Sequence, residues 1–196
     1  MPLDPARTTS LLTDACQGNP TAADDLLQLV YSDLRAVASQ LLDRERAGHT
    51  LQPTALVHEA WMRLIDQQCL SNVDSDEARR RFIGLAAHAM RQVLVDHARR
   101  RNRDKRGGGM LPVTLSTAIP IAATTDCATI LDLEAALVAL QQRSERLARV
   151  AELRIFGGLS TQEAANVVGV SLATAKADWA LAQALLTKSM RDTSQS

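Results

Sequence analysis

The chain has 196 residues, with 22 Lys and Arg balanced by 22 Asp and Glu, and 46% of its residues are apolar although only 3% are aromatic. Ala, Leu and Val supply most of the apolar residues, which favours packed helices and argues against a β-sandwich or barrel, whose strands prefer aromatic and β-branched residues. No segment reaches the roughly 20 uncharged apolar residues of a membrane span, and three widely spaced cysteines predict neither a disulfide framework nor a metal motif. The N-terminus shows no apolar signal core, so we expect a cytoplasmic protein.

Hydrophobic periodicity predicts three helices in the N-terminal half of the chain. Apolar residues recur at three- and four-residue steps over 20–41, after an Asn-Pro helix start. Proline also begins the second predicted helix, 53–65, whose apolar residues form a one-sided stripe. A polar loop over 67–77 precedes the third helix, which starts near Arg79 and ends at the three consecutive glycines from Gly107.

The zero net charge hides a strongly basic block. Residues 79–106 contain 10 basic and 2 acidic residues, whereas residues 1–78 contain 5 basic and 12 acidic ones. Blocks of this kind favour phosphate binding, because each neutralised phosphate releases counterions. Nine of the ten basic residues are arginine, whose fork of donors suits bidentate phosphate contact better than lysine does. The alternative is a solvated helix surface with salt bridges of its own.

The composition changes after the basic block and divides the chain. Residues 107–128 are rich in Gly, Thr and Ala and almost uncharged, which is typical of a flexible linker. Helical periodicity returns at about residue 131. We therefore expect an all-α protein with two small helical domains, 1–106 and 129–196, joined by that linker.

The end of the chain has the spacing of a helix-turn-helix. Ser160 and Glu163 form a capping box that opens a short helix, 161–168, closed by Gly169. Ser171 can cap a last helix that runs through Leu186. A short helix, a glycine turn and a second capped helix are the elements of a DNA-binding helix-turn-helix, although an ordinary corner of two helices has similar spacing.

Three motifs in this order point to one family. Residues 56–61 read Leu-Val-His-Glu-Ala-Trp, residues 82–100 combine an apolar stripe with arginines and Asp96-His97, and residues 152–165 place Phe-Gly-Gly before the capping box. They resemble regions 2.2, 2.3–2.4 and 4 of extracytoplasmic-function (ECF) sigma factors, the promoter-recognition subunits of bacterial RNA polymerase. The resemblance covers about 11–190. It implies core RNA polymerase and promoter DNA as partners, no enzyme activity, and no cofactor or metal.

The resemblance also implies where the partners bind. The helix 53–65 would dock the clamp helices of the largest polymerase subunit through Leu56, His58, Glu59 and Arg63. The basic block would open DNA at the minus-ten element, and the last helix would read the minus-thirty-five element in the major groove. The expected DNA contacts are Arg79, Arg80, Arg81, Arg91, Arg99, Arg100, Arg101, Arg103, Lys105, Arg106, Ser171, Thr174 and Lys176.

The chain departs from the family pattern just before the docking motif. ECF factors usually carry an acidic cluster there, whereas residues 52–55 read Gln-Pro-Thr-Ala. The resemblance to a subgroup that lacks these acids implies activation by a Ser/Thr protein kinase. A phosphate on Thr50 or Thr54 would restore about −1.5 to −2 charge near the helix N-terminus. We expect such a switch, with Thr50 as first choice; the alternative is that both threonines only cap the helix.

Two other classes remain open. One is a free-standing helix-turn-helix regulator, and the other is a polymerase-binding adaptor that reads no DNA. The second is permitted because the last helix carries only Lys176 and Lys188, with Asp178 between them. An enzyme is not expected: His58-Glu59 begins like a zinc-protease motif, but Met62 occupies the position of its second histidine.

Overall fold

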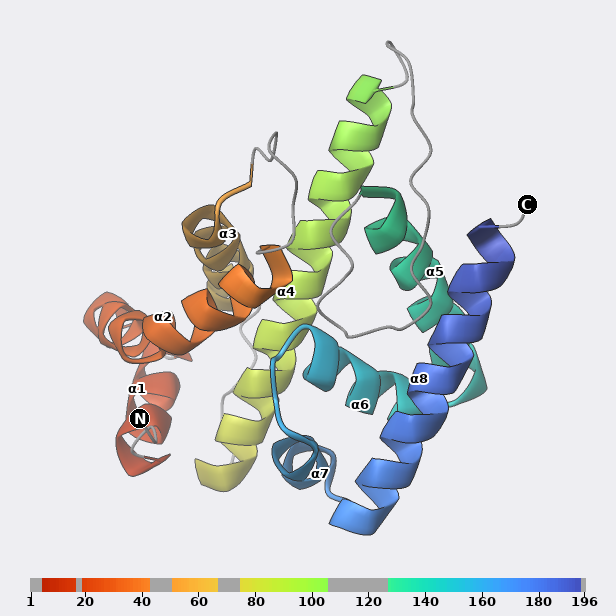
Figure 1. The fold of residues 1–196 in the computed structure, drawn as a ribbon. Coiled ribbons are helices and arrows are strands. Elements are labelled where there is room, and N and C mark those ends of the chain that lie inside the picture. Colours follow the sequence, from red (N-terminus) through yellow and green to blue (C-terminus); the bar gives the residue numbers. More distant parts are fainter. Residues whose placement is uncertain (1–4, 17–18, 43–50, 67–74, 106–126, 195–196) are drawn as a thin grey trace.

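The computed structural model describes residues 5–16, 19–42, 51–66, 75–105 and 127–194, and every regular element in these ranges is an α-helix (Figure 1). In chain order they are α1 (Pro5–Cys16), α2 (Pro20–Leu42), α3 (Pro53–Asp66), α4 (Ser75–Lys105), α5 (Cys127–Arg143), α6 (Glu145–Ile155), α7 (Thr161–Val168) and α8 (Leu172–Ser194). The predicted all-α fold is confirmed. Within the described ranges, none of these helices has the length and apolar character needed to cross a membrane.

The long helix α4 lies between the two halves of the chain (Figure 1). It contacts α1 and α3 on one side and α5, α6 and α7 on the other. One core cluster contains Met90 and Val93 of α4 together with Leu137 and Leu153 of the C-terminal half. The two halves therefore share a hydrophobic core in addition to any connection through the linker.

Local capping rules explain why the helices begin and end where they do. The side-chain oxygen of Asn19 accepts hydrogen bonds from the backbone N–H of Thr21 and Ala22 and so caps α2. The predicted capping box opens α7, because Glu163 N–H donates to the Ser160 hydroxyl and Ser160 N–H donates to the Glu163 carboxylate. Gly169 ends α7 with a φ of 77°, which confirms the predicted glycine cap.

Four element boundaries differ from the sequence-based predictions. Helix α1 was not predicted; its Leu11 packs against the smaller core cluster around Trp61. Helix α4 begins at Ser75, inside the predicted polar loop, and α5 begins at Cys127, inside the predicted linker. Helix α8 continues past Leu186 to Ser194, because the side chain of Met190 is buried in the main core cluster. The rest of the linker lies outside the described residues.

The turn between α6 and α7 fits closely against α2. Gly158 has a φ of 64°, and a Cβ atom added there would lie 2.6 Å from Cγ2 of Val37. A Cβ on the adjacent Gly157 would lie 2.6 Å from the carbonyl oxygen of Leu153 and 3.3 Å from the Cβ of Ala87. Neighbouring atoms therefore leave no room for a side chain at either glycine. Two of these neighbours, Val37 and Ala87, belong to the N-terminal half of the chain.

Gly158→Ala should therefore destabilise the protein more than Gly169→Ala does. Both glycines have positive φ, and that conformation alone costs an alanine about 1–2 kcal/mol. Only Gly158 adds a steric conflict, since no atom lies within 4 Å of a Cβ at Gly169. Urea unfolding of both variants measures the difference. Equal losses of unfolding free energy would contradict the contact between the turn and α2.

Candidate polymerase and DNA interface

The arginines of the basic block form two groups at the two ends of α4. Residues 79–81 lie in its first turns, and about 30 Å separates them from Arg99–Arg101 at the helical rise per residue. Arg99, Arg100 and Arg103 are exposed, and Arg101 is half-buried. The side chains of 79–81 and Lys105, and all of Arg106, lie outside the described residues. The exposed C-terminal group is the part of the block that solvent reaches in the described structure.

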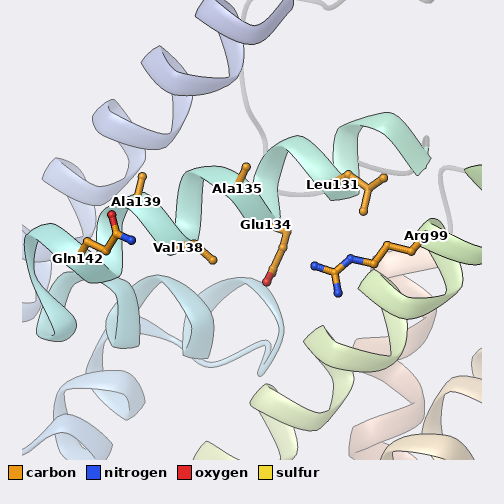
Figure 2. Close-up of a pocket in the computed structure, with 7 residues that line it drawn as sticks. All are labelled: Arg99, Leu131, Glu134, Ala135, Val138, Ala139 and Gln142. Atoms are coloured by element: carbon orange, nitrogen blue, oxygen red, sulfur yellow. The ribbon is translucent and has the colours of Figure 1, made fainter.

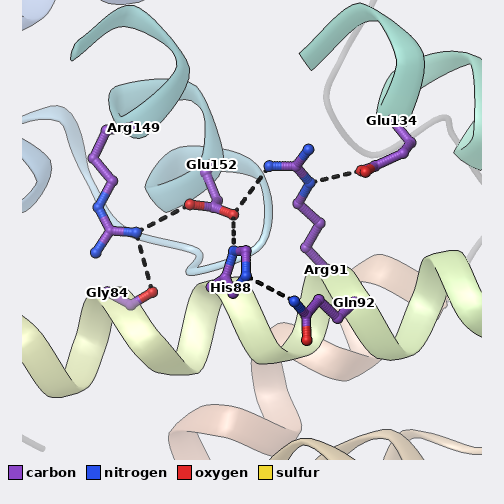
Figure 3. Close-up of polar contacts among 7 residues, drawn as sticks. All are labelled: Gly84, His88, Arg91, Gln92, Glu134, Arg149 and Glu152. Atoms are coloured by element: carbon purple, nitrogen blue, oxygen red, sulfur yellow. Dashed lines mark hydrogen bonds and ion pairs between the residues drawn. The ribbon is translucent and has the colours of Figure 1, made fainter. Parts of the chain in front are cut away.

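Arg91 lies between these groups and is buried, contrary to its expected place on a DNA-binding surface. Its side chain is only 9% exposed. The Nε atom donates to Glu134 of α5 at 2.7 Å, and Nη1 donates to Glu152 of α6 at 3.2 Å (Figure 3). In this arrangement Arg91 is held by two carboxylates of the C-terminal half and cannot reach a phosphate.

Glu152 is the centre of a polar cluster that joins the two halves (Figure 3). Its side chain is 7% exposed and accepts from Arg91, from Nδ1 of His88 at 2.9 Å and from Nη1 of Arg149 at 3.0 Å. Arg149 also donates to the carbonyl oxygen of Gly84. Buried carboxylates need charged or hydrogen-bonding partners of this kind.

Space for Arg149 is provided by the absence of a side chain on α4. A Cβ atom added to Gly84 would overlap the Arg149 guanidinium group. Glycine inside a helix lowers its stability relative to alanine. At Gly84 the Arg149 guanidinium from α6 occupies the space that a larger side chain of α4 would take.

The cluster shifts the pKa values of its two most buried members toward the charged forms. Burial alone would raise the pKa of Glu152, but interactions with His88, Arg91 and Arg149 outweigh burial and lower it. Burial alone would lower the pKa of Arg91, but hydrogen bonds and attraction from Glu134 and Glu152 raise it. Both groups are therefore charged at neutral pH, and each depends on the other half of the chain for its partner.

A cleft of about 540 Å³ lies between α4 and α5, beside this cluster (Figure 2). Arg99 lines it from α4, and Leu131, Glu134 and Val138 are among its α5 residues. Arg91 and Arg99 therefore both face α5. The C-terminal half covers Arg91, whereas Arg99 lines the cleft and remains exposed.

Helix α3 presents a polar edge to solvent. His58 and Glu59 are exposed, and the adjacent Met62 is 68% exposed. Arg63 is ion-paired with Asp96 of α4 at 2.9 Å, which fixes α3 against α4. Leu56 is completely buried, so the structure places it in the core instead of on the expected docking surface.

Asp96 and His97 of α4 face α3, where Arg63 and Glu59 lie. Burial lowers the pKa of His97, and the charges of Arg101 and Arg100 act in the same direction against an opposing effect of Glu59. His97 is therefore neutral at pH 7. With the Asp96–Arg63 pair, it belongs to the packing of α3 on α4.

The first turn of α8 is capped and partly exposed. The Ser171 hydroxyl accepts from the Thr174 backbone N–H at 3.1 Å and contacts the Thr174 hydroxyl at 2.8 Å. Ser171 and Lys176 are exposed, whereas Thr174 is half-buried. Asp178 is buried and accepts two hydrogen bonds from Arg146 of α6, at 2.7 and 3.1 Å. The negative charge of Asp178 is thus paired with Arg146 inside the protein. It does not lie on the exposed surface of α8 that would contact DNA.

The comparison with protein families decides the class. The ECF sigma factor family model matches residues 5–192, which include α1, the arginine-rich α4 and the α7–α8 pair. The chain belongs to the ECF sigma factor family. Core RNA polymerase and promoter DNA are the partners of such a factor. A search of curated proteins found no match to this sigma factor.

The residues that sequence reasoning missed are the partners of Arg91. Glu134 and Glu152 lie 43 and 61 residues away in the chain, so no local pattern connects them. One observation could have identified Glu152: it lies in the apolar run of α6, between the buried residues Ala151 and Leu153. A carboxylate at such a position requires a buried cation.

Proposed function

We propose that this ECF sigma factor docks core RNA polymerase through α3, contacts the minus-ten element with the exposed arginines of α4, and reads the minus-thirty-five element with α8. The family match over 5–192 carries this proposal, because it includes all three elements in one chain. The exposed Arg100 and Arg103 support the second role. The capped, exposed start of α8 supports the third.

Docking is proposed to depend on the exposed edge of α3. Glu59 offers a carboxylate and Met62 an apolar contact, side by side on the surface. An acidic group there complements basic residues on the clamp helices, and complementary charge sets both the encounter rate and the register of a complex.

Glu59→Lys should weaken binding to core polymerase by about tenfold, because it places like charges opposite each other. Binding is measured by fluorescence anisotropy of the labelled sigma factor titrated with core enzyme. Asp24→Lys, an equal charge change at an exposed position of α2, is the matched control and should bind like the wild type. Equal affinities for all three proteins would remove α3 from the docking surface.

Phosphorylation is proposed to supply the charge that the docking helix lacks. The first turn of α3 contains no acidic residue. Thr54 is half-buried in that turn, whereas Thr50 precedes the helix and lies outside the described residues. The partial burial of Thr54 limits the access of a Ser/Thr kinase to it, so Thr50 remains the first choice. A phosphate there would lie near the positive end of the helix dipole.

The test compares Thr50→Ala with the wild type, each co-expressed with the kinase, and Thr54→Ala is the matched control. We expect the Thr50→Ala protein to bind core polymerase about tenfold more weakly and to lose most transcription, since it cannot gain the added charge. The wild type and Thr54→Ala should respond to the kinase equally. Undiminished binding and transcription by Thr50→Ala would refute a switch at this residue.

A further inference from the structure

The start of α8 offers few groups that can form sequence-specific hydrogen bonds with DNA bases. Residues 171–180 contain no Arg, Asn, Gln or Glu, which supply most direct contacts to guanine, adenine and cytosine in the major groove. Asp178, the one carboxylate of this segment, is buried and bound by Arg146. Base recognition by hydrogen bonds is therefore limited to a small number of side chains.

The hydroxyl groups at the start of α8 add little discrimination between bases. The Ser171 hydroxyl accepts from the backbone N–H of Thr174 at 3.1 Å, and the two hydroxyl oxygens lie 2.8 Å apart. A hydroxyl group can also pair with any of the four bases. The exposed Lys176 is left as the polar side chain that can select a base, because its ammonium group can donate to O6 and N7 of guanine.

The remaining exposed face of this segment consists of methyl groups. Ala173, Ala177 and Ala180 are exposed, whereas Ala175 is completely buried. Spacings of four and three residues place the exposed alanines on one side of the helix, beside Lys176. In the major groove, an alanine methyl group makes its specific contact with the C5-methyl group of thymine. The exposed face therefore matches thymine better than any other base.

The spacing of the alanines also matches the spacing of base pairs. Ala173 and Ala177 are about 6 Å apart along the axis of α8, at the helical rise per residue. Two steps of duplex DNA, at about 3.4 Å each, cover nearly the same distance. The two methyl groups can thus meet thymines that lie about two base pairs apart.

We propose that α8 recognises its DNA element through thymine methyl groups, which Ala173 and Ala177 contact, and through one neighbouring guanine, which Lys176 contacts. This inference rests on the proposed function of α8, and it names the class of DNA sequence that α8 selects. Burial of one methyl group changes affinity by about fourfold. The element is therefore read by several small contacts in place of one strong bidentate pair.

The test uses DNA fragments that the complex of this sigma factor with core RNA polymerase, the holoenzyme, selects from a random pool. Each thymine of the shared minus-thirty-five element is replaced in turn by deoxyuridine, which lacks only the C5-methyl group. Fluorescence anisotropy of labelled fragments measures holoenzyme affinity. We expect about fourfold weaker binding at one or two thymines. The same replacement between the minus-ten and minus-thirty-five elements is the DNA control and should leave the affinity unchanged.

Protein variants identify the partner of each sensitive thymine. Ala177→Gly removes the proposed methyl contact, so this variant should bind thymine and deoxyuridine equally at one sensitive position. Ala184→Gly is the matched control, because it makes the same change at an exposed position two turns further along α8, and it should retain the fourfold difference. Each variant is compared on two DNAs, so its own loss of helix stability cancels. Ala173→Gly repeats the comparison and decides the matter if Ala177→Gly fails to fold.

The role of Lys176 is tested by Lys176→Gln. This variant should lose about tenfold discrimination for guanine at one position of the element, while its sensitivity to deoxyuridine remains. Unchanged preference for guanine would overturn the Lys176 contact.

Two results would overturn the methyl contacts: equal wild-type binding to thymine and deoxyuridine at every position, or a difference that persists in both the Ala173→Gly and Ala177→Gly proteins. Failure of the proposed function has a different result. In that case the holoenzyme would select no shared element near minus thirty-five, which would overturn both the function of α8 and this inference.

Discussion

Leu153→Ala is expected to destabilise both halves of the chain together, by about 2–5 kcal/mol. Leu153 is completely buried in α6 and belongs to the core cluster that also contains Met90 and Val93 of α4. Loss of its side chain leaves a cavity in a core that both halves share. The destabilisation should therefore extend to the N-terminal half, from which Leu153 is distant in sequence.

The two tryptophans allow this prediction to be measured in each half separately. Trp61 lies in the N-terminal half and Trp179 in the C-terminal half. With Trp179→Phe or Trp61→Phe as the background, fluorescence during urea unfolding reports one half at a time. We expect the two transitions to coincide and to shift equally on Leu153→Ala. A Trp61 transition that does not move would contradict the shared core.

A surface substitution provides the control for this experiment. Leu181 of α8 is 49% exposed, so Leu181→Ala removes the same atoms without opening a core cavity. Its effect should stay within about 0.5 kcal/mol in both single-tryptophan backgrounds.

Loss of Arg100 and Arg103 together should weaken promoter binding by the holoenzyme by at least about tenfold at moderate salt. Both side chains are exposed near the end of α4. Each lost phosphate contact also reduces the slope of log affinity against log salt by about one. The double variant Arg100→Gln/Arg103→Gln should therefore lower that slope by about two.

The measurement uses DNA fragments that the wild-type holoenzyme selects from a random pool, at several salt concentrations. Arg143→Gln, a change of exposed charge at the end of α5, is the control and should leave the slope unchanged. A double variant with the wild-type slope would show that these arginines make no phosphate contact.

The parts of the fold that could be predicted from the sequence are those fixed by neighbouring residues. The Ser160–Glu163 capping box and the Gly169 cap were predicted because each acts within one helical turn. Helix α1 was missed because its only large aliphatic residues, Leu11 and Leu12, are adjacent and give no repeat at three- and four-residue steps. Its position depends on packing of Leu11 against a cluster formed by distant residues.

The candidate site shows the same division between local and distant determinants. The resemblance placed Arg100 and Glu59 on binding surfaces, and both are exposed in the structure. The burial of Arg91 depends on two carboxylates, one from α5 and one from α6. The spacing of residues within α4 could not indicate that these carboxylates pack against it. Two local signs were present: a glycine inside α4, Gly84, where Arg149 approaches, and the carboxylate of Glu152 in an apolar stretch of α6.

Transcription from a pool of genomic DNA fragments by core RNA polymerase, with and without this chain, tests the central claim most directly. Sequencing of the RNA 5′ ends identifies every start site. We predict new start sites that appear only with the sigma factor and share two upstream elements, one near minus ten and one near minus thirty-five. The same start sites with and without the chain would contradict its function as an initiation factor.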